Sequence, residues 1–111
     1  MQASTNTNNS KLSPEEMQSF ISAINEDAFN QLRSLYYDTA LTANANVFSS
    51  LQQLVPASHI LLGTDYPFAP ASEPASALQG INAYSSFSEQ DRQDIEGNNA
   101  LQLFPRLQNL R

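Results

Sequence analysis

The fold is decided by one stretch of the sequence, His59-Ile60-Leu61-Leu62-Gly63-Thr64-Asp65. Its centre is apolar throughout, which is typical of a strand that is covered on both faces in a parallel sheet. A proline-rich loop follows, from Tyr66 to Pro74. The pattern therefore predicts a buried strand over 59–65 that ends at a turn.

A second strand and a helix are expected before this stretch. Ser34–Leu41 is short, rich in aromatic residues and free of Gly and Pro, which predicts a strand. Asn44–Val55 carries its apolar residues on one helical face and stops before Pro56, which predicts a helix. A strand–helix–strand unit of this kind almost always forms a right-handed crossover between two parallel strands.

A helix is also expected near the N-terminus. Ser13 can cap it, Pro14 suits its first position, and Glu16 completes a capping box. An apolar stripe that starts at Met17 continues the helix to near Asn25, and Phe29 and Leu32 either continue it or form a separate turn. The residues before it, 1–12, are almost all polar and are predicted to form a disordered tail.

Further helices are expected after the proline-rich loop. They cover residues 75–84, residues 89–97 with Ser88 as the cap, and a short turn over 100–104 that Pro105 stops. The predicted domain is therefore a single segment over 13–111. Its class is α/β, with about two parallel strands and flanking helices.

The composition excludes several classes of function. The chain has 111 residues, 5 Lys and Arg against 11 Asp and Glu, and a net charge of −6. Nucleic acids and anionic membranes need a concentrated positive face, so neither is expected as a partner. There is no cysteine and His59 is the one histidine, which excludes a disulfide framework and a multi-histidine metal site within this chain. No apolar run could span a bilayer and no secretory signal is evident, so a cytoplasmic location is expected.

Two parallel strands do not make a stable sheet alone, because parallel strands occur in larger sheets that helices cover on both faces. The sequence thus has the elements of part of an α/β protein. It indicates either a fragment or a chain that completes its sheet with a partner. The alternative is a small, mostly helical protein with a two-stranded ribbon.

Asp65 is the candidate for chemistry. In parallel α/β sheets, ligands bind outside the carboxyl ends of the strands, and Asp65 ends the clearest strand. A carboxylate at that place could hold a metal ion or move a proton. The alternative is that Asp65 caps the loop through its own backbone amides.

Asp38 and His59 are the other residues that could take part in chemistry. Asp38 would approach the same sheet edge if the strands are parallel and in register, and it could then pair with Asp65; the alternative is that it bonds nearby amides or hydroxyls. His59 lies about 20 Å from Asp65 along an extended strand, so it is expected to be a surface or packing residue. Catalysis by Ser, His and Asp would need a positioned histidine, and the glycines are too scattered for a phosphate loop.

Three stretches together resemble a known family. They are Leu35-Tyr36-Tyr37-Asp38-Thr39-Ala40, Leu54 to Phe68 with its Gly63-Thr64-Asp65-Tyr66-Pro67 motif, and the Asn99-Ala100…Leu103-Phe104-Pro105-Arg106-Leu107 ending. This pattern resembles the C-terminal portion of the amidohydrolase-related family, in the branch of aminocarboxymuconate-semialdehyde and 6-methylsalicylate decarboxylases. The resemblance covers about Pro14 to Leu107.

The resemblance implies a fold and an activity. The family fold is a metal-dependent (β/α)8 TIM barrel, in which Ser34–Leu41 would be the seventh strand and His59–Asp65 the eighth. Asp65 would match the aspartate of the eighth strand, which lies at the metal centre and can assist proton transfer. The implied chemistry is hydrolysis or decarboxylation of a small carboxylic acid with a divalent metal, zinc above all.

This chain departs from the family in what it lacks. A barrel needs roughly 200 residues or more, and the family takes its other metal ligands from histidines in earlier strands. One carboxylate cannot hold a catalytic zinc, which normally has three protein ligands. We therefore expect a truncated product, a partial gene model or a chain cut from a longer one, inactive alone and without bound metal. The alternative is a non-catalytic protein that forms homo-oligomers, or pairs with a fuller barrel, through exposed strand edges.

Overall fold

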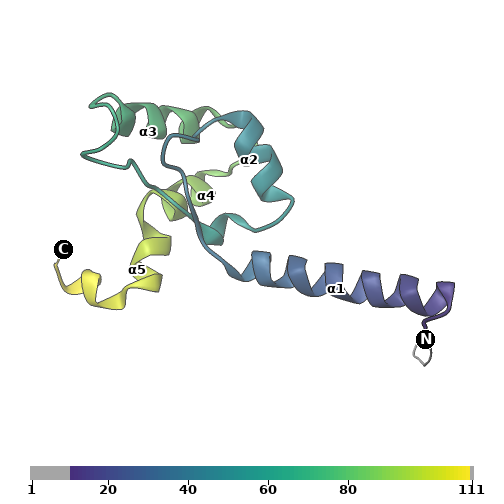
Figure 1. Cartoon of the computed structure of the whole chain (residues 1–111). Coiled ribbons are helices and arrows are strands. Elements are labelled where there is room, and N and C mark those ends of the chain that lie inside the picture. The colour runs from purple at the N-terminus through teal and green to yellow at the C-terminus, as the bar shows by residue number, and fades with distance from the viewer. Residues whose placement is uncertain (1–10, 111) are drawn as a thin grey trace. The chain divides into compact units, whose positions relative to one another are not determined.

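The computed structural model describes residues 11–110 (Figure 1). Apart from Lys11 and Leu12, the tail predicted over residues 1–12 lies outside this range. The chain divides into two compact units, with the boundary between Leu32 and Arg33.

The first unit is dominated by one helix, α1 (Pro14–Ser34), which Figure 1 shows as uninterrupted. Its start is the predicted capping box, because the Ser13 amide donates to Glu16 Oε1 at 2.8 Å and the Glu16 amide donates to Ser13 Oγ at 3.1 Å. The predicted end near Asn25 is wrong, and the alternative in which Phe29 and Leu32 continue the helix is confirmed. No Gly or Pro interrupts the sequence after Asn25, and the Gln31 side chain bonds Asp27 one turn earlier, so the helix continues to Ser34.

The second unit contains two short strands, β1 (Tyr37–Asp38) and β2 (Ile60–Leu61). They pair in parallel, with Tyr37 opposite Ile60 and Asp38 opposite Leu61, so the predicted parallel pair is confirmed. The predicted strand lengths, 34–41 and 59–65, are wrong. Ser34, the predicted start of the first strand, belongs to helix α1. A short 3₁₀ helix, η1 (Ala57–His59), replaces the start of the second strand.

Helices α2 (Ala45–Gln52) and α3 (Glu73–Ala83) follow β1 and β2 along the chain. Asn44 caps α2 by accepting a hydrogen bond from the Val47 amide at 3.0 Å. Helix α3 starts with Glu73 and Pro74, two positions before the predicted start, because proline is well tolerated in the first turn. A Cβ on Gly80 of α3 would run into the Ala43 carbonyl, so only glycine allows this close packing.

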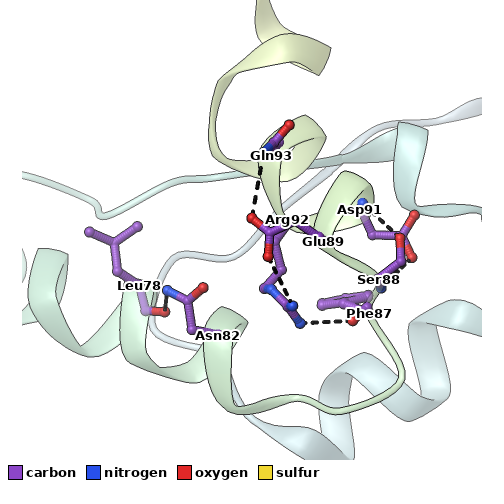
Figure 2. Close-up of polar contacts among 8 residues, drawn as sticks. All are labelled: Leu78, Asn82, Phe87, Ser88, Glu89, Asp91, Arg92 and Gln93. Carbon is purple, nitrogen blue, oxygen red and sulfur yellow. Dashed lines mark hydrogen bonds and ion pairs between the residues drawn. The ribbon is translucent and has the colours of Figure 1, made fainter.

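The last helices form one continuous run. It consists of α4 (Glu89–Gln93), the π-helical turn η2 (Asp94–Asn98) and α5 (Asn99–Leu103), and the 3₁₀ helix η3 (Pro105–Leu110) follows. Figure 2 shows the predicted Ser88 cap, in which Ser88 and Asp91 exchange hydrogen bonds at 3.0 Å. The predicted break after Gly97 is wrong, because the π turn carries the helix onward.

The π turn leaves a helix carbonyl available to the sheet. The Asn99 amide donates to the Asp94 carbonyl, five residues back, instead of to Ile95 as an α-helix would require. The Ile95 carbonyl instead accepts the Leu62 amide at 2.9 Å. The Leu62 amide lies just past β2 and points away from β1, and this helix carbonyl is its hydrogen-bond acceptor.

The core of the second unit lies among these elements. Its buried apolar side chains form one cluster, made of Phe48, Val55, Ile60, Ile81, Phe87 and Ile95. The rings of Phe48 and Phe87 lie 4.9 Å apart in a tilted arrangement that suits an aromatic pair. Residues from α2, β2, α3 and the last helical run thus share one core. Among residues 11–110, no helix has both the length and the apolar character needed to cross a membrane.

Candidate functional site

The candidate site lies at the carboxyl end of the β1–β2 pair. There the chain leaves β1 through Thr39 and leaves β2 through Gly63, Thr64 and Asp65. The last backbone bond between the two segments is donated by the Thr39 amide to the Leu61 carbonyl at 3.0 Å. Both sequence-predicted carboxylates, Asp38 and Asp65, belong to this end.

Asp38 turns the chain after β1. Its Oδ1 accepts the Ala40 amide at 2.8 Å, which is a local turn of the kind that aspartate commonly forms. The same carboxylate also lies against Gly63, where a Cβ would come within 2.8 Å of Oδ1. The interpretation of Asp38 as a partner of nearby amides is therefore confirmed.

Thr39 links the two segments beyond the point where backbone pairing stops. Its hydroxyl donates to the Gly63 carbonyl at 3.2 Å and accepts the Gly63 amide at 3.2 Å. The side chain is 2% exposed, so these bonds satisfy a buried hydroxyl. No role for Thr39 followed from its place in the sequence, although a Thr next to a strand-ending Asp was a visible signal.

Asp65 occupies a left-handed backbone conformation, with φ of 58°, which aspartate adopts more readily than most residues. Its main-chain carbonyl accepts the amides of Phe68 and Ala69, at 2.8 and 2.9 Å. The Thr64 hydroxyl accepts the Tyr66 amide at 3.3 Å. Within residues 11–110, the hydrogen bonds of this loop therefore go to other groups than the Asp65 carboxylate, and Asp65 is exposed.

These residues do not form a complete metal site. Residues 11–110 contain no group of three or more His, Cys, Asp or Glu side chains that could hold a metal ion. A catalytic zinc takes three protein ligands, and Asp65 could supply one of them. The zinc that the family resemblance implied does not fit the described residues alone.

His59 lies at the amino end of the pair, as its sequence position predicted. Its Nδ1 is 2.8 Å from the Leu35 carbonyl, and its ring stacks on Tyr36 with centroids 4.3 Å apart and planes 4° apart. These contacts confirm that His59 packs within the fold.

Two polar residues that the sequence did not assign also shape this region. Asn99 is 5% exposed, and its Nδ2 donates to the carbonyls of Ala57 and Ile60 at 2.8 and 2.9 Å. Glu73 Oε2 accepts the amide of Leu41, whose φ is 60°, at 2.8 Å. Asn99 stands in the ending that carried the family resemblance, but both of its partners are distant in sequence.

Comparisons with known proteins identify relatives of this chain. The chain is 29% identical over 85 residues to 6-methylsalicylic acid decarboxylase of Penicillium expansum, covering 77% of this chain and 26% of that protein. It is 33% identical over 89 residues to a decarboxylase of Aspergillus niger, covering 75% of this chain and 23% of that protein. It is 33% identical over 81 residues to 2-amino-3-carboxymuconate-6-semialdehyde decarboxylase of Caenorhabditis elegans, covering 73% of this chain and 20% of that protein.

The chain thus spans about a quarter of the length of the curated relatives that it matches. No solved structure matches it. The sequence profile of the family described as Amidohydrolase matches residues 18–106, which include β1, β2 and the last helical run. This chain therefore belongs to the amidohydrolase family.

Proposed function

We propose that residues 13–111 are the C-terminal segment of an amidohydrolase-family decarboxylase that acts on a small carboxylic acid. In this proposal β1 and β2 are the seventh and eighth strands of a (β/α)8 barrel. The observation that carries it is the exposed Asp65 carboxylate at the carboxyl end of a parallel strand pair, which is where barrel enzymes place their reacting groups. The relatives named as decarboxylases support the same reaction class.

Asp65 is the residue of this segment that we assign to the reaction. Decarboxylation replaces a carbon–carbon bond by a carbon–hydrogen bond, so a proton must be delivered to the carbon that loses CO₂. A carboxyl group that no neighbouring amide occupies is free to carry that proton or to ligate a metal ion. The other ligands would come from earlier barrel strands, so we expect the isolated chain to bind zinc weakly and to have no activity.

A chimaera tests this function. The matching segment of the Penicillium expansum decarboxylase is replaced by residues 18–106 of this chain, and CO₂ release from 6-methylsalicylic acid is measured. We expect turnover in the chimaera, and a loss of about 100-fold or more in kcat for Asp65→Asn, the size typical of a lost general acid or base. Glu96→Gln is the matched control, because Glu96 is an exposed carboxylate on η2.

Two results would contradict the proposal. One is an active chimaera in which Asp65→Asn and Glu96→Gln have the same kcat. The other is clear turnover by the purified chain alone with added zinc, which would show that this segment does not depend on the rest of a barrel.

A second candidate function is a non-catalytic interaction protein. Helix α1 has no buried residue and exposes large apolar side chains, including Phe20 at 56% and Ile24 at 52%. Exposed apolar surface of this kind favours association with another chain. Sedimentation at decreasing protein concentration distinguishes the candidates, since this function requires oligomers that survive dilution, whereas a monomer at all concentrations contradicts it.

A further inference from the structure

The parallel ladder is extended by a side chain at its carboxyl end. In a regular parallel pair, the amide after the Thr39–Leu61 bond would be satisfied by a backbone carbonyl of the neighbouring strand. Here the Gly63 amide donates to the Thr39 hydroxyl, and the same hydroxyl donates to the Gly63 carbonyl. One buried side chain thus holds both polar groups of a single residue.

Gly63 is held from a second direction by Asp38. A Cβ on Gly63 would lie 2.8 Å from Asp38 Oδ1 and 2.9 Å from Asp38 Cγ, so the backbone of Gly63 packs directly on that carboxylate. The Asp38 carboxylate is itself fixed by the Ala40 amide at 2.8 Å. Gly63 therefore has little freedom to shift along or across the sheet.

Asp65 follows this anchored residue after a single intervening residue, Thr64. On its other side, the Asp65 carbonyl is held by the amides of Phe68 and Ala69. The left-handed backbone of Asp65 thus lies between two fixed points, Gly63 and the turn at residues 66–69. The direction of its carboxylate depends on both.

We infer that Thr39 is a positioning residue, whose hydroxyl fixes Gly63 and thereby sets the place and direction of the Asp65 carboxylate. Its importance for the reaction rests on the function proposed above. The positioning itself is a property of this chain and can be measured without any turnover.

Amide hydrogen exchange in the intact chain tests the positioning. In the unmodified protein and in Thr39→Ser, which keeps the hydroxyl, the Gly63 amide exchanges slowly. In Thr39→Val, which keeps the shape but loses the hydroxyl, it exchanges at least roughly tenfold faster, as expected when a hydrogen bond of ordinary strength is lost. The Leu62 amide is the internal control, because it donates to the Ile95 carbonyl and keeps its protection in all three proteins.

The same spectra report on Asp65. The Asp65 resonances move in Thr39→Val and return to their original positions in Thr39→Ser, a rescue that a general loss of stability would not produce. A Gly63 amide that exchanges freely in the unmodified chain would overturn the proposal, even if Thr39→Val does not fold. Unmoved Asp65 resonances in a folded Thr39→Val protein would overturn it as well.

The chimaera separates this proposal from the proposed function. There Thr39→Val lowers kcat by about 100-fold with little change in KM, the loss that a small misplacement of a reacting group can cause. In an Asp65→Asn background the same change has no further effect on kcat. If Asp65→Asn leaves kcat unchanged, the proposed function fails while the exchange data still decide the positioning. If Thr39→Val lowers kcat equally with and without Asp65, the proposal for Thr39 fails.

Discussion

The two ends of the β1–β2 pair differ in what their polar side chains do. At the amino end, side chains bind main-chain carbonyls, whereas at the carboxyl end the Asp65 carboxylate is exposed to solvent. His59 contacts the Leu35 carbonyl, and Asn99 donates to two carbonyls around η1 and β2. At the other end, Thr39 bonds both polar groups of Gly63, but the Asp65 side chain remains exposed.

This difference separates the two tasks of a parallel α/β sheet. The amino end is closed by polar groups that have found partners, so it contributes to stability. At the carboxyl end, the hydrogen bonds of Thr39 hold the backbone of Gly63, and the Asp65 carboxylate is exposed to solvent. Barrel enzymes carry their reacting groups at this end of the strands. Variants of the two ends test this difference separately.

The largest effect is expected at the amino end, for Asn99→Ala. This variant removes the donor to both carbonyls. The Ala57 carbonyl still accepts the Ile60 amide, but the buried Ile60 carbonyl loses the Asn99 donor, and we expect a cost of about 3 kcal/mol in the free energy of unfolding. Urea unfolding followed by circular dichroism measures it. The neighbouring Asn98→Ala is the control, since Asn98 is exposed and should change stability by less than about 0.5 kcal/mol. Equal losses in the two variants would show that the amino end has no special role.

An intermediate effect is expected at the carboxyl end, for Gly63→Ala. The added methyl group meets the Asp38 carboxylate, which must move away from the Ala40 amide, and we expect a loss of about 1–2 kcal/mol. A double-mutant cycle with Asp38→Ala should recover part of that loss, because the clash is then removed. Gly97→Ala is the matched control, since a Cβ there meets no atom within 4 Å. Additive losses for Gly63→Ala and Asp38→Ala would contradict the contact.

The smallest effect lies outside the sheet, at the start of α1. The hydrogen bond from the Ser13 amide, and then the bond with the Ser13 hydroxyl, hold the pKa of Glu16 below its usual value of 4.5. A lowered folded-state pKa adds stability above the unfolded-state pKa, and that stability is lost as the pH falls through the folded-state pKa. The helical signal of α1 should therefore weaken slightly below about pH 4.5, and the Ser13 amide resonance should report it. Ser13→Ala keeps the amide but loses the hydroxyl, so the pKa should move only part of the way back toward 4.5. An unchanged titration would show that the Ser13 hydroxyl does not hold Glu16 in solution.

The sequence predicted the parallel pair because an apolar run and an amphipathic helix are local signals. It overestimated the strand lengths, since the bridge from Thr39 to Gly63 takes over where backbone pairing stops, and such a bridge joins residues that are distant in sequence. For helix α1, the sequence left two ends open, near Asn25 or beyond Leu32, because Phe29 and Leu32 could also have formed a separate turn; the structure has the longer helix. The π turn over 94–98 could not be predicted, because the spacing of apolar residues does not distinguish it from an α-helical turn.

The candidate site was predictable in part. The position of Asp65 past the end of a strand followed from the chain order, and the turn made by Asp38 was one of two stated alternatives. The bonds between Thr39 and Gly63, and those from Asn99 to two carbonyls, could not be predicted. Each depends on which main-chain groups lie nearby in three dimensions. The role of Asp65 in a reaction stays a prediction.

The π turn over 94–98 has a consequence for changes in chain length. A π turn holds one residue more than an α-helical turn would need, and this extra residue is what releases the Ile95 carbonyl to the Leu62 amide. Deleting one residue there would return that carbonyl to the helix and rotate Asn99 by about 100° around the helix axis, away from the carbonyls that it binds. Substitutions at an exposed position such as Glu96 leave the count unchanged. In this segment, the number of residues therefore matters more to the fold than the identity of most of them.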